Sequence, residues 1–142
     1  MRRDVRRREG VDLLTSARLL PDQMAAFSDL MASFDGLGAS QPYDVSALRA
    51  DSNWPWAAIH GVYVFVREDE VVYVGRALGT TIGQRLWSHL RSLEEPAWAD
   101  VIEDPATRVE VIAVDADYAC LSAALEVYLI ERFNPQFNRR AC

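Results

Sequence analysis

The stretch "GVYVFVREDEVVYVGRA", residues 61–77, decides the fold of this 142-residue chain. Two runs rich in Val, Tyr and Phe flank a short acidic turn, a pattern that predicts a β-hairpin with strands at 61–67 and 70–76. Each run carries one tyrosine and one outer glycine: Tyr63 with Gly61, and Tyr73 with Gly75. Because a plain hairpin could use Val or Ile at all four positions, these residues need a separate explanation.

The segments outside the hairpin predict helices and one further strand. Residues 115–133 form the strongest helical pattern, and Pro135 ends it. Residues 80–93 predict a helix that Thr80 or Thr81 can cap. The other expected elements are a strand at 108–115 and helices at 21–34, 43–51 and 96–104.

We expect two parts in the chain, a basic arm plus helical extension at 1–56 and a main domain at 57–142. The extension should pack away from the active face of the hairpin. Its apolar residues need a surface to bury against, and Trp54 and Trp56 are expected to provide part of it; these apolar residues are Met24, Phe27, Leu30 and Phe34.

Charge and cysteine content restrict the function only in part. The net charge of −6 argues against nucleic acid, yet all 15 basic residues are arginine, five of them in the first eight positions. Arginine suits bidentate phosphate contacts, but codon bias in a GC-rich genome explains it equally well. Cys120 and Cys142 form no disulfide framework and no metal-binding spacing, which favours a reducing cytoplasm. We expect no membrane association, because no apolar run approaches the roughly 18 residues of a span.

Three charged residues break the local pattern. Glu126 is the single charge between Asp117 and Glu131 of an otherwise apolar helix, so it is either a buried ion-pair partner or a site residue. Arg85 and His89 are four apart and share one helix face. Taken alone, Arg85 could be a solvated arginine and His89 a histidine at the core edge. Two phenols, an arginine, a histidine and a buried glutamate together suit phosphodiester chemistry.

These residues, in this order, resemble the signature of the GIY-YIG nuclease domain. "GVY" and "YVG" match the two halves of that signature, and Arg76 stands where the family has a basic residue. "QRLWSHL" supplies Arg85 and His89, and "LEVYLIERFNPQFN" supplies Glu126 and, beyond Pro135, Asn138. The segment from Gly75 to Arg85 is slightly long for the family. The resemblance covers residues 61–138 and implies an α+β fold: a small three-stranded antiparallel sheet flanked by helices, with the N-terminal helical extension added.

The resemblance also implies an activity, metal-dependent endonucleolytic hydrolysis of nucleic acid, with DNA rather than RNA as the expected substrate. It implies that Tyr63 is the general base and that Glu126 holds a single Mg²⁺ or Mn²⁺. Arg85 would clamp the phosphate, Arg76 would add positive charge, and Tyr73 and His89 would orient the nucleophile or leaving group. Gly61, Gly75 and Asn138 would support the site, the glycines by clearing room for the scissile backbone. The metal and the two arginines should favour the Tyr63 phenolate.

Two other functions stay open, a catalytically retired module that binds nucleic acid or a protein partner, and a structural interaction domain whose N-terminal helices dock a partner. The oligomeric state is left open as well.

The shared chemistry requires both phenols on one face of the sheet, facing Arg85 and Glu126. A two-residue turn at Glu68 and Asp69 would put Tyr63 and Tyr73 on opposite faces. Such a turn normally needs Asn-Gly or Asp-Gly, which this sequence lacks. We therefore predict an odd-numbered loop, with Tyr63 opposite Tyr73, or an equivalent bulge.

Overall fold

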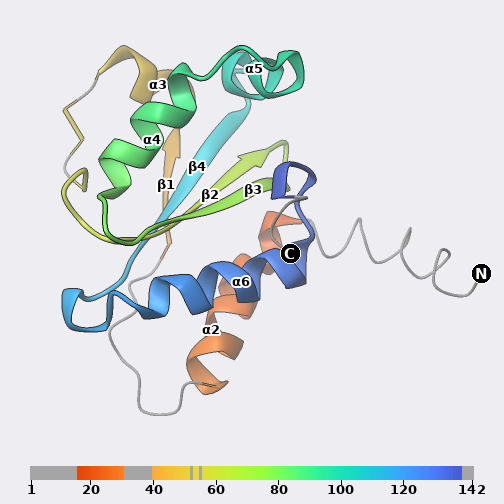
Figure 1. Cartoon of the computed structure of the whole chain (residues 1–142). Helices are drawn as coiled ribbons and strands as arrows, with labels where there is room; N and C mark the ends of the chain where they lie inside the picture. Colours follow the sequence, from red (N-terminus) through yellow and green to blue (C-terminus); the bar gives the residue numbers. More distant parts are fainter. Residues whose placement is uncertain (1–15, 31–39, 52, 55, 139–142) are drawn as a thin grey trace, which may run out of the picture.

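The computed structural model describes residues 16–30, 40–51, 53–54 and 56–138 (Figure 1). The basic arm predicted at the start of the extension lies outside them, as do Met31 and Phe34 of the first predicted helix. The elements in chain order are η1 (Ala17–Leu19), α2 (Leu20–Leu30), β1 (Gln41–Asp44), α3 (Val45–Ala50), β2 (Gly61–Arg67), β3 (Glu70–Ala77), α4 (Ile82–Arg91), α5 (Pro96–Glu103), β4 (Thr107–Ala113), η2 (Ala116–Tyr118), α6 (Leu121–Phe133) and η3 (Gln136–Asn138).

The sheet is antiparallel and has four strands, in the order β1-β4-β2-β3. The expected count of three strands is therefore wrong, because Gln41–Asp44 of the N-terminal extension pairs with β4. This strand lacks an apolar alternation, since only Tyr43 in it is half-buried. Its Pro42 is tolerated because β1 is an edge strand.

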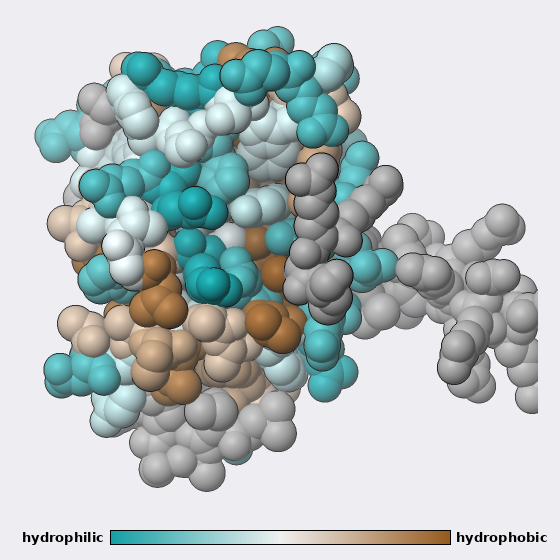
Figure 2. Space-filling view, viewed as in Figure 1, coloured by the Kyte–Doolittle hydropathy of each residue, from teal (hydrophilic) through white to brown (hydrophobic). Residues whose placement is uncertain are grey.

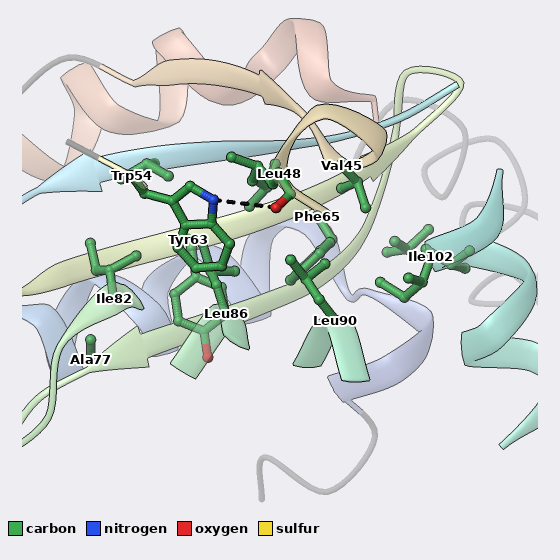
Figure 3. Close-up of a cluster of buried hydrophobic side chains, with 14 of the residues drawn as sticks. Val45, Leu48, Trp54, Tyr63, Phe65, Ala77, Ile82, Leu86, Leu90 and Ile102 are labelled. Carbon is green, nitrogen blue, oxygen red and sulfur yellow. Dashed lines mark hydrogen bonds between the residues drawn. The ribbon is translucent and has the colours of Figure 1, made fainter. Parts of the chain in front are cut away.

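Helices cover both faces of the sheet, so the domain has three layers (Figure 1). On one face α3, α4 and α5 bury side chains such as Leu48, Leu86 and Ile102 against Tyr63 and Phe65 (Figure 3). On the other face α2 and α6 pack against the alternate residues of β2 and β3. The two faces follow from the period of two in a strand, which sends neighbouring side chains to opposite sides.

The N-terminal helix α2 packs beside α6, away from α4. Met24 and Phe27 are buried there, and the ring centroids of Phe27 and Tyr128 are 5.5 Å apart. The expected packing of these residues on Trp54 and Trp56 is wrong, because both tryptophans belong to the core on the opposite face. In Figure 3 the Trp54 indole donates to the carbonyl of Leu48 at 3.3 Å.

Helix α6 starts later than predicted and is not buried all round. The chain after Asp115 first makes the short η2 turn, which the Asp115 carboxylate caps by accepting from the amide of Asp117. Val127 on α6 is 50% exposed, so the helix buries one side only. Figure 2 shows hydrophobic residues gathered over α6 and α2, and more polar residues over the opposite half of the molecule. The helix ends at Asn134, whose φ of 47° is left-handed.

The hairpin turns through two residues, not the predicted odd number. Glu68 and Asp69 both have left-handed φ angles, 51° and 69°. The N-terminal extension holds this turn: the Ser16 hydroxyl donates to Asp69 Oδ2 and the Ala17 amide donates to its carbonyl, both at 2.7 Å. These contacts from a distant segment stabilise a turn that Glu-Asp would not favour alone.

The equivalent bulge that we predicted as the alternative is present. Phe65 lies opposite Tyr73 and Val66 lies opposite Val71, so Val72 is the extra residue of β3. Because of the bulge, the two tyrosines lie on the same face of the sheet, as predicted. Their register differs from the prediction, since Tyr63 lies opposite Gly75 and not opposite Tyr73.

None of the helices in the described ranges combines the length and the apolar composition that a membrane span needs.

Candidate active site

The two tyrosines and His89 form a compact cluster where β2 and β3 meet α4. The Tyr63 hydroxyl lies 2.8 Å from Nε2 of His89, and the ring centroids of Tyr63 and Tyr73 are 6.3 Å apart. His89 lies 4.9 Å from Tyr73 between centroids. The helix that carries His89 begins with a capping box between Thr81 and Gln84, which fixes its first turn. In Figure 3 the Tyr63 hydroxyl points away from Leu48 and Trp54, out of the apolar cluster.

The glycines make room for the protein itself, and this corrects the expectation that they clear space for the scissile backbone. A Cβ on Gly75 would lie 2.4 Å from Cζ of Tyr63, so the phenol lies directly over this glycine. A Cβ on Gly61, where φ is +155°, would lie 2.1 Å from the carbonyl oxygen of Ile112. Gly75 therefore lets the Tyr63 ring cross β3 to the sheet edge, and Gly61 lets β4 approach β2.

Asn138 completes the outer edge of β3. Its Oδ1 accepts from the amide of Val74 at 2.7 Å, and its Nδ2 donates to the carbonyl of Val74 at 2.8 Å. A single side chain thus pairs with the edge strand as a neighbouring strand would. The expected supporting role agrees with this contact, which ties the C-terminal segment to the wall of the site.

Glu126 reaches this edge from α6, on the other face of the sheet. Its Oε1 lies 2.7 Å from Nη1 of Arg76, and its side chain is 16% exposed. Glu126 also raises the pKa of both tyrosines and of Arg85, so its charge acts on the same cluster. The structure shows that Glu126 forms an ion pair, and it places this pair beside the cluster, so the pair is compatible with a role in the site.

Burial decides the protonation of the tyrosines. It raises the pKa of Tyr63 well above its ordinary value, while the Arg85 guanidinium opposes the change. The pKa of Tyr73 is raised for the same reason. Among the protein's own groups, Arg85 therefore acts in the expected direction but burial outweighs it, and both phenols are neutral at pH 7. The phenol of Tyr63 in turn raises the pKa of Arg85.

The imidazole of His89 is neutral near pH 7. Burial, aided by the positive charge of Arg85, lowers its pKa to about 4. A neutral imidazole has one nitrogen free to accept a proton. Nε2 of His89 can therefore accept the hydrogen bond of the Tyr63 hydroxyl, provided that the ring carries its own proton on Nδ1.

A metal ion would have few ligands from the protein. The described residues contain no group of three or more His, Cys, Asp or Glu that could enclose an ion. Glu126 offers one carboxylate, and one of its oxygens is shared with Arg76. Mg²⁺ keeps several waters and is often held by one or two carboxylates plus substrate phosphates, so this single carboxylate fits such an ion.

Sequence reasoning missed the aromatic wall beside Tyr73. Trp98 of α5 lies 5.8 Å from Tyr73 between ring centroids, and its indole donates to the His89 carbonyl at 2.9 Å. Phe137 of η3 packs on Trp98 at 5.1 Å. No local pattern signals these contacts, because they join three separate segments.

Comparisons with known proteins identify the family. A search of curated proteins finds no match. The family model described as the UvrC-like GIY-YIG domain matches residues 59–139. That range includes all nine residues that the sequence analysis assigned to the site. Because the matched range is more than half of the chain, the protein belongs to the UvrC-like GIY-YIG domain family, a family of nucleases.

Proposed function

We propose that the protein is a metal-dependent endonuclease that hydrolyses phosphodiester bonds, with DNA as its substrate. The observation that carries this proposal is the hydrogen bond of 2.8 Å between the Tyr63 hydroxyl and Nε2 of His89. This hydrogen bond joins the candidate base, the Tyr63 phenol, to an imidazole that can take its proton. An arginine, Arg85, and a carboxylate, Glu126, act on the same cluster. The family assignment supports a nucleic-acid substrate.

In this mechanism Tyr63 removes a proton from the attacking water while its own proton passes to His89. The phenol can exchange protons in this way without first ionising, which burial disfavours. The water oxygen bonds to phosphorus, and the bond from phosphorus to the leaving oxygen breaks. Tyr73, which contacts both Tyr63 and His89, holds this pair in place and orients the water.

In this mechanism the charged groups of the site bind the phosphate and stabilise its charge. Arg85 is exposed and can offer its guanidinium to two phosphate oxygens in parallel. A single Mg²⁺ or Mn²⁺ held by Glu126 would polarise the phosphoryl oxygen and stabilise the leaving oxygen. Arg76 holds the Glu126 carboxylate at the edge of β3 and adds positive charge there.

A retired module is the alternative function, and the ion pair of Arg76 with Glu126 is the observation that favours it. This pair engages an oxygen that a metal ion would need. A retired module would bind DNA without nicking it, so activity separates the two functions.

The test is nicking of supercoiled plasmid with Mg²⁺ or Mn²⁺, followed on agarose gels. We expect nicking by the wild-type protein and none by Arg85→Ala. Arg85→Lys should not restore it, because lysine makes no bidentate contact. Arg91→Ala is the matched control, since Arg91 lies on the same helix but stacks on Trp87 at 3.6 Å, outside the cluster.

Plasmid binding without nicking under any divalent ion would contradict the endonuclease and favour the retired module. Near-wild-type turnover by Arg85→Lys would contradict the bidentate contact of Arg85 with the phosphate, but not the endonuclease activity. The cytoplasmic location, the division of the chain at residue 56 and the choice of DNA over RNA stay predictions.

A further inference from the structure

A pocket of about 260 Å³ opens directly beside the candidate active site. Its lining includes Tyr73 and His89 of the site, two more aromatic rings, and two exposed acids; these are Trp98, Phe137, Glu94 and Glu95. It is smaller than the pockets of about 300–1,000 Å³ that hold drug-sized ligands, so its size suits one heterocyclic ring system.

The aromatic rings of this pocket come from three segments and meet at steep angles. Trp98 contacts Phe137 edge to face at 73°, and it contacts Tyr73 at 66°. The Trp98 indole N–H is already bonded to the His89 carbonyl, so the ring contributes an apolar surface and no free donor. Walls of this kind stack well on flat, neutral rings.

The exposed carboxylates of the pocket are acceptors, and they are distinct from the hydroxyl of Tyr73 and the imidazole of His89 on the side of the active site. Glu94 and Glu95 are exposed, and no salt bridge joins either of them to another described residue. The Ser92 hydroxyl, also in the lining, is used by the carbonyl of Ser88 at 2.9 Å. Among the residues that the structure describes, no arginine lines the pocket, and its two free carboxylates favour a neutral group that carries N–H donors over a phosphate.

We propose that this pocket receives one unstacked nucleobase that carries an exocyclic amino group, next to the phosphate held by Arg85. The proposal rests on the proposed nucleic-acid substrate and adds its form, a strand with a base displaced from the helix. Carboxylates accept from the amino group of cytosine, whereas thymine has no such group. Bases splayed out of the stack are read by aromatic stacking and by hydrogen bonds to their edges.

The test measures binding in EDTA, where cleavage plays no part. The probes are a fluorescent duplex, the same duplex with one extra cytosine, and the same duplex with one extra thymine. A fourth probe carries 2-aminopurine as the extra base, because its fluorescence increases when the base leaves the stack. We expect the cytosine bulge to bind roughly 10-fold more tightly than the thymine bulge, the size of one well-placed hydrogen-bonded pair.

Two variants probe the pocket, and a third is the matched control. Phe137→Leu keeps an apolar side chain but removes the ring, and it should weaken binding of the cytosine bulge on the order of 10-fold. The double variant Glu94→Gln with Glu95→Gln should remove the preference for cytosine over thymine, because an amide can also donate to thymine. Glu103 is an exposed acid on α5 outside the pocket, so Glu103→Gln should change neither the affinity for the cytosine bulge nor the preference for cytosine over thymine.

The proposal would be overturned if the protein bound all the duplexes equally and the extra 2-aminopurine stayed stacked in its duplex. This holds even if the protein nicks plasmid. Binding of free dCMP as tightly as the cytosine bulge would also overturn it, since the pocket would then serve a free nucleotide. Bulge binding that depends on Phe137, in a protein that does not nick DNA, would support the pocket and contradict the endonuclease.

Discussion

Replacing Gly75 with alanine tests the packing that brings Tyr63 to the edge of the sheet. The added Cβ would lie 2.4, 2.5 and 2.6 Å from three atoms of the Tyr63 side chain, far inside van der Waals contact. The ring cannot move away freely, because its hydroxyl is bonded to His89 and the rings of Phe65 and Tyr73 lie next to it, with centroids 6.2 and 6.3 Å away. The backbone of β3 is equally fixed, by β2 on one side and Asn138 on the other.

Because neither partner yields, Gly75→Ala should lower the free energy of unfolding by about 1–3 kcal/mol, the usual cost of overpacking a core. In a Tyr63→Val background the ring is gone. Alanine should then be neutral or stabilising by roughly 0.5–1 kcal/mol, since glycine weakens a strand. The two substitutions should therefore show a coupling energy of about 1–4 kcal/mol.

Urea unfolding of the four proteins, followed by tryptophan fluorescence and circular dichroism, measures this coupling. Gly79→Ala is the control: its Cβ would meet nothing within 4 Å, so its cost comes from a φ of +76° and should not depend on Tyr63. A Gly75→Ala cost that is the same with and without the Tyr63 ring would refute the reasoning. The glycine would then be needed for another property of β3.

Three further predictions concern the edge and the charges of the site. Asn138→Ala should lower the free energy of unfolding, measured in urea, by roughly 1–3 kcal/mol, because it leaves the Val74 amide and carbonyl without their partner. An unchanged free energy of unfolding would show that water replaces the side chain. Glu126→Ala should abolish nicking yet change the free energy of unfolding by no more than about 1 kcal/mol, since its partner Arg76 is 45% exposed; a loss of several kcal/mol would indicate a structural pair instead. The pKa of His89 is about 4 when folded and 6.5 when unfolded, so between these values the unfolded state binds the proton first. The contribution of His89 to the free energy of unfolding is therefore present above pH 6.5 and falls by roughly 3 kcal/mol as the pH drops to 4. His89→Gln should remove this part of the pH dependence of stability, and identical profiles for the two proteins would contradict the burial of a neutral ring.

The sequence alone was enough to predict the central elements of the fold. The hairpin, the helix of Arg85 and His89, and the third strand all carry strong local patterns, and the structure confirms each to within a few residues. A shared face for Tyr63 and Tyr73 was predicted from the chemistry that they would share, since local patterns leave the register open, and the bulge in β3 produces it although the turn has two residues. The order of the signature residues was sufficient to name the family that the comparison found.

Only the tertiary structure decided the remaining features, because each depends on contacts between distant segments. The fourth strand exists because β4 offers it an open edge, and residues 41–44 carry no strand pattern of their own. The two-residue turn depends on Ser16 and Ala17, more than fifty positions away from Asp69. The reason for Gly75 became visible only when the Tyr63 ring was placed over it. Local pattern fixes which side of an element is apolar, but the partner that covers it is set by packing energies summed over the whole domain.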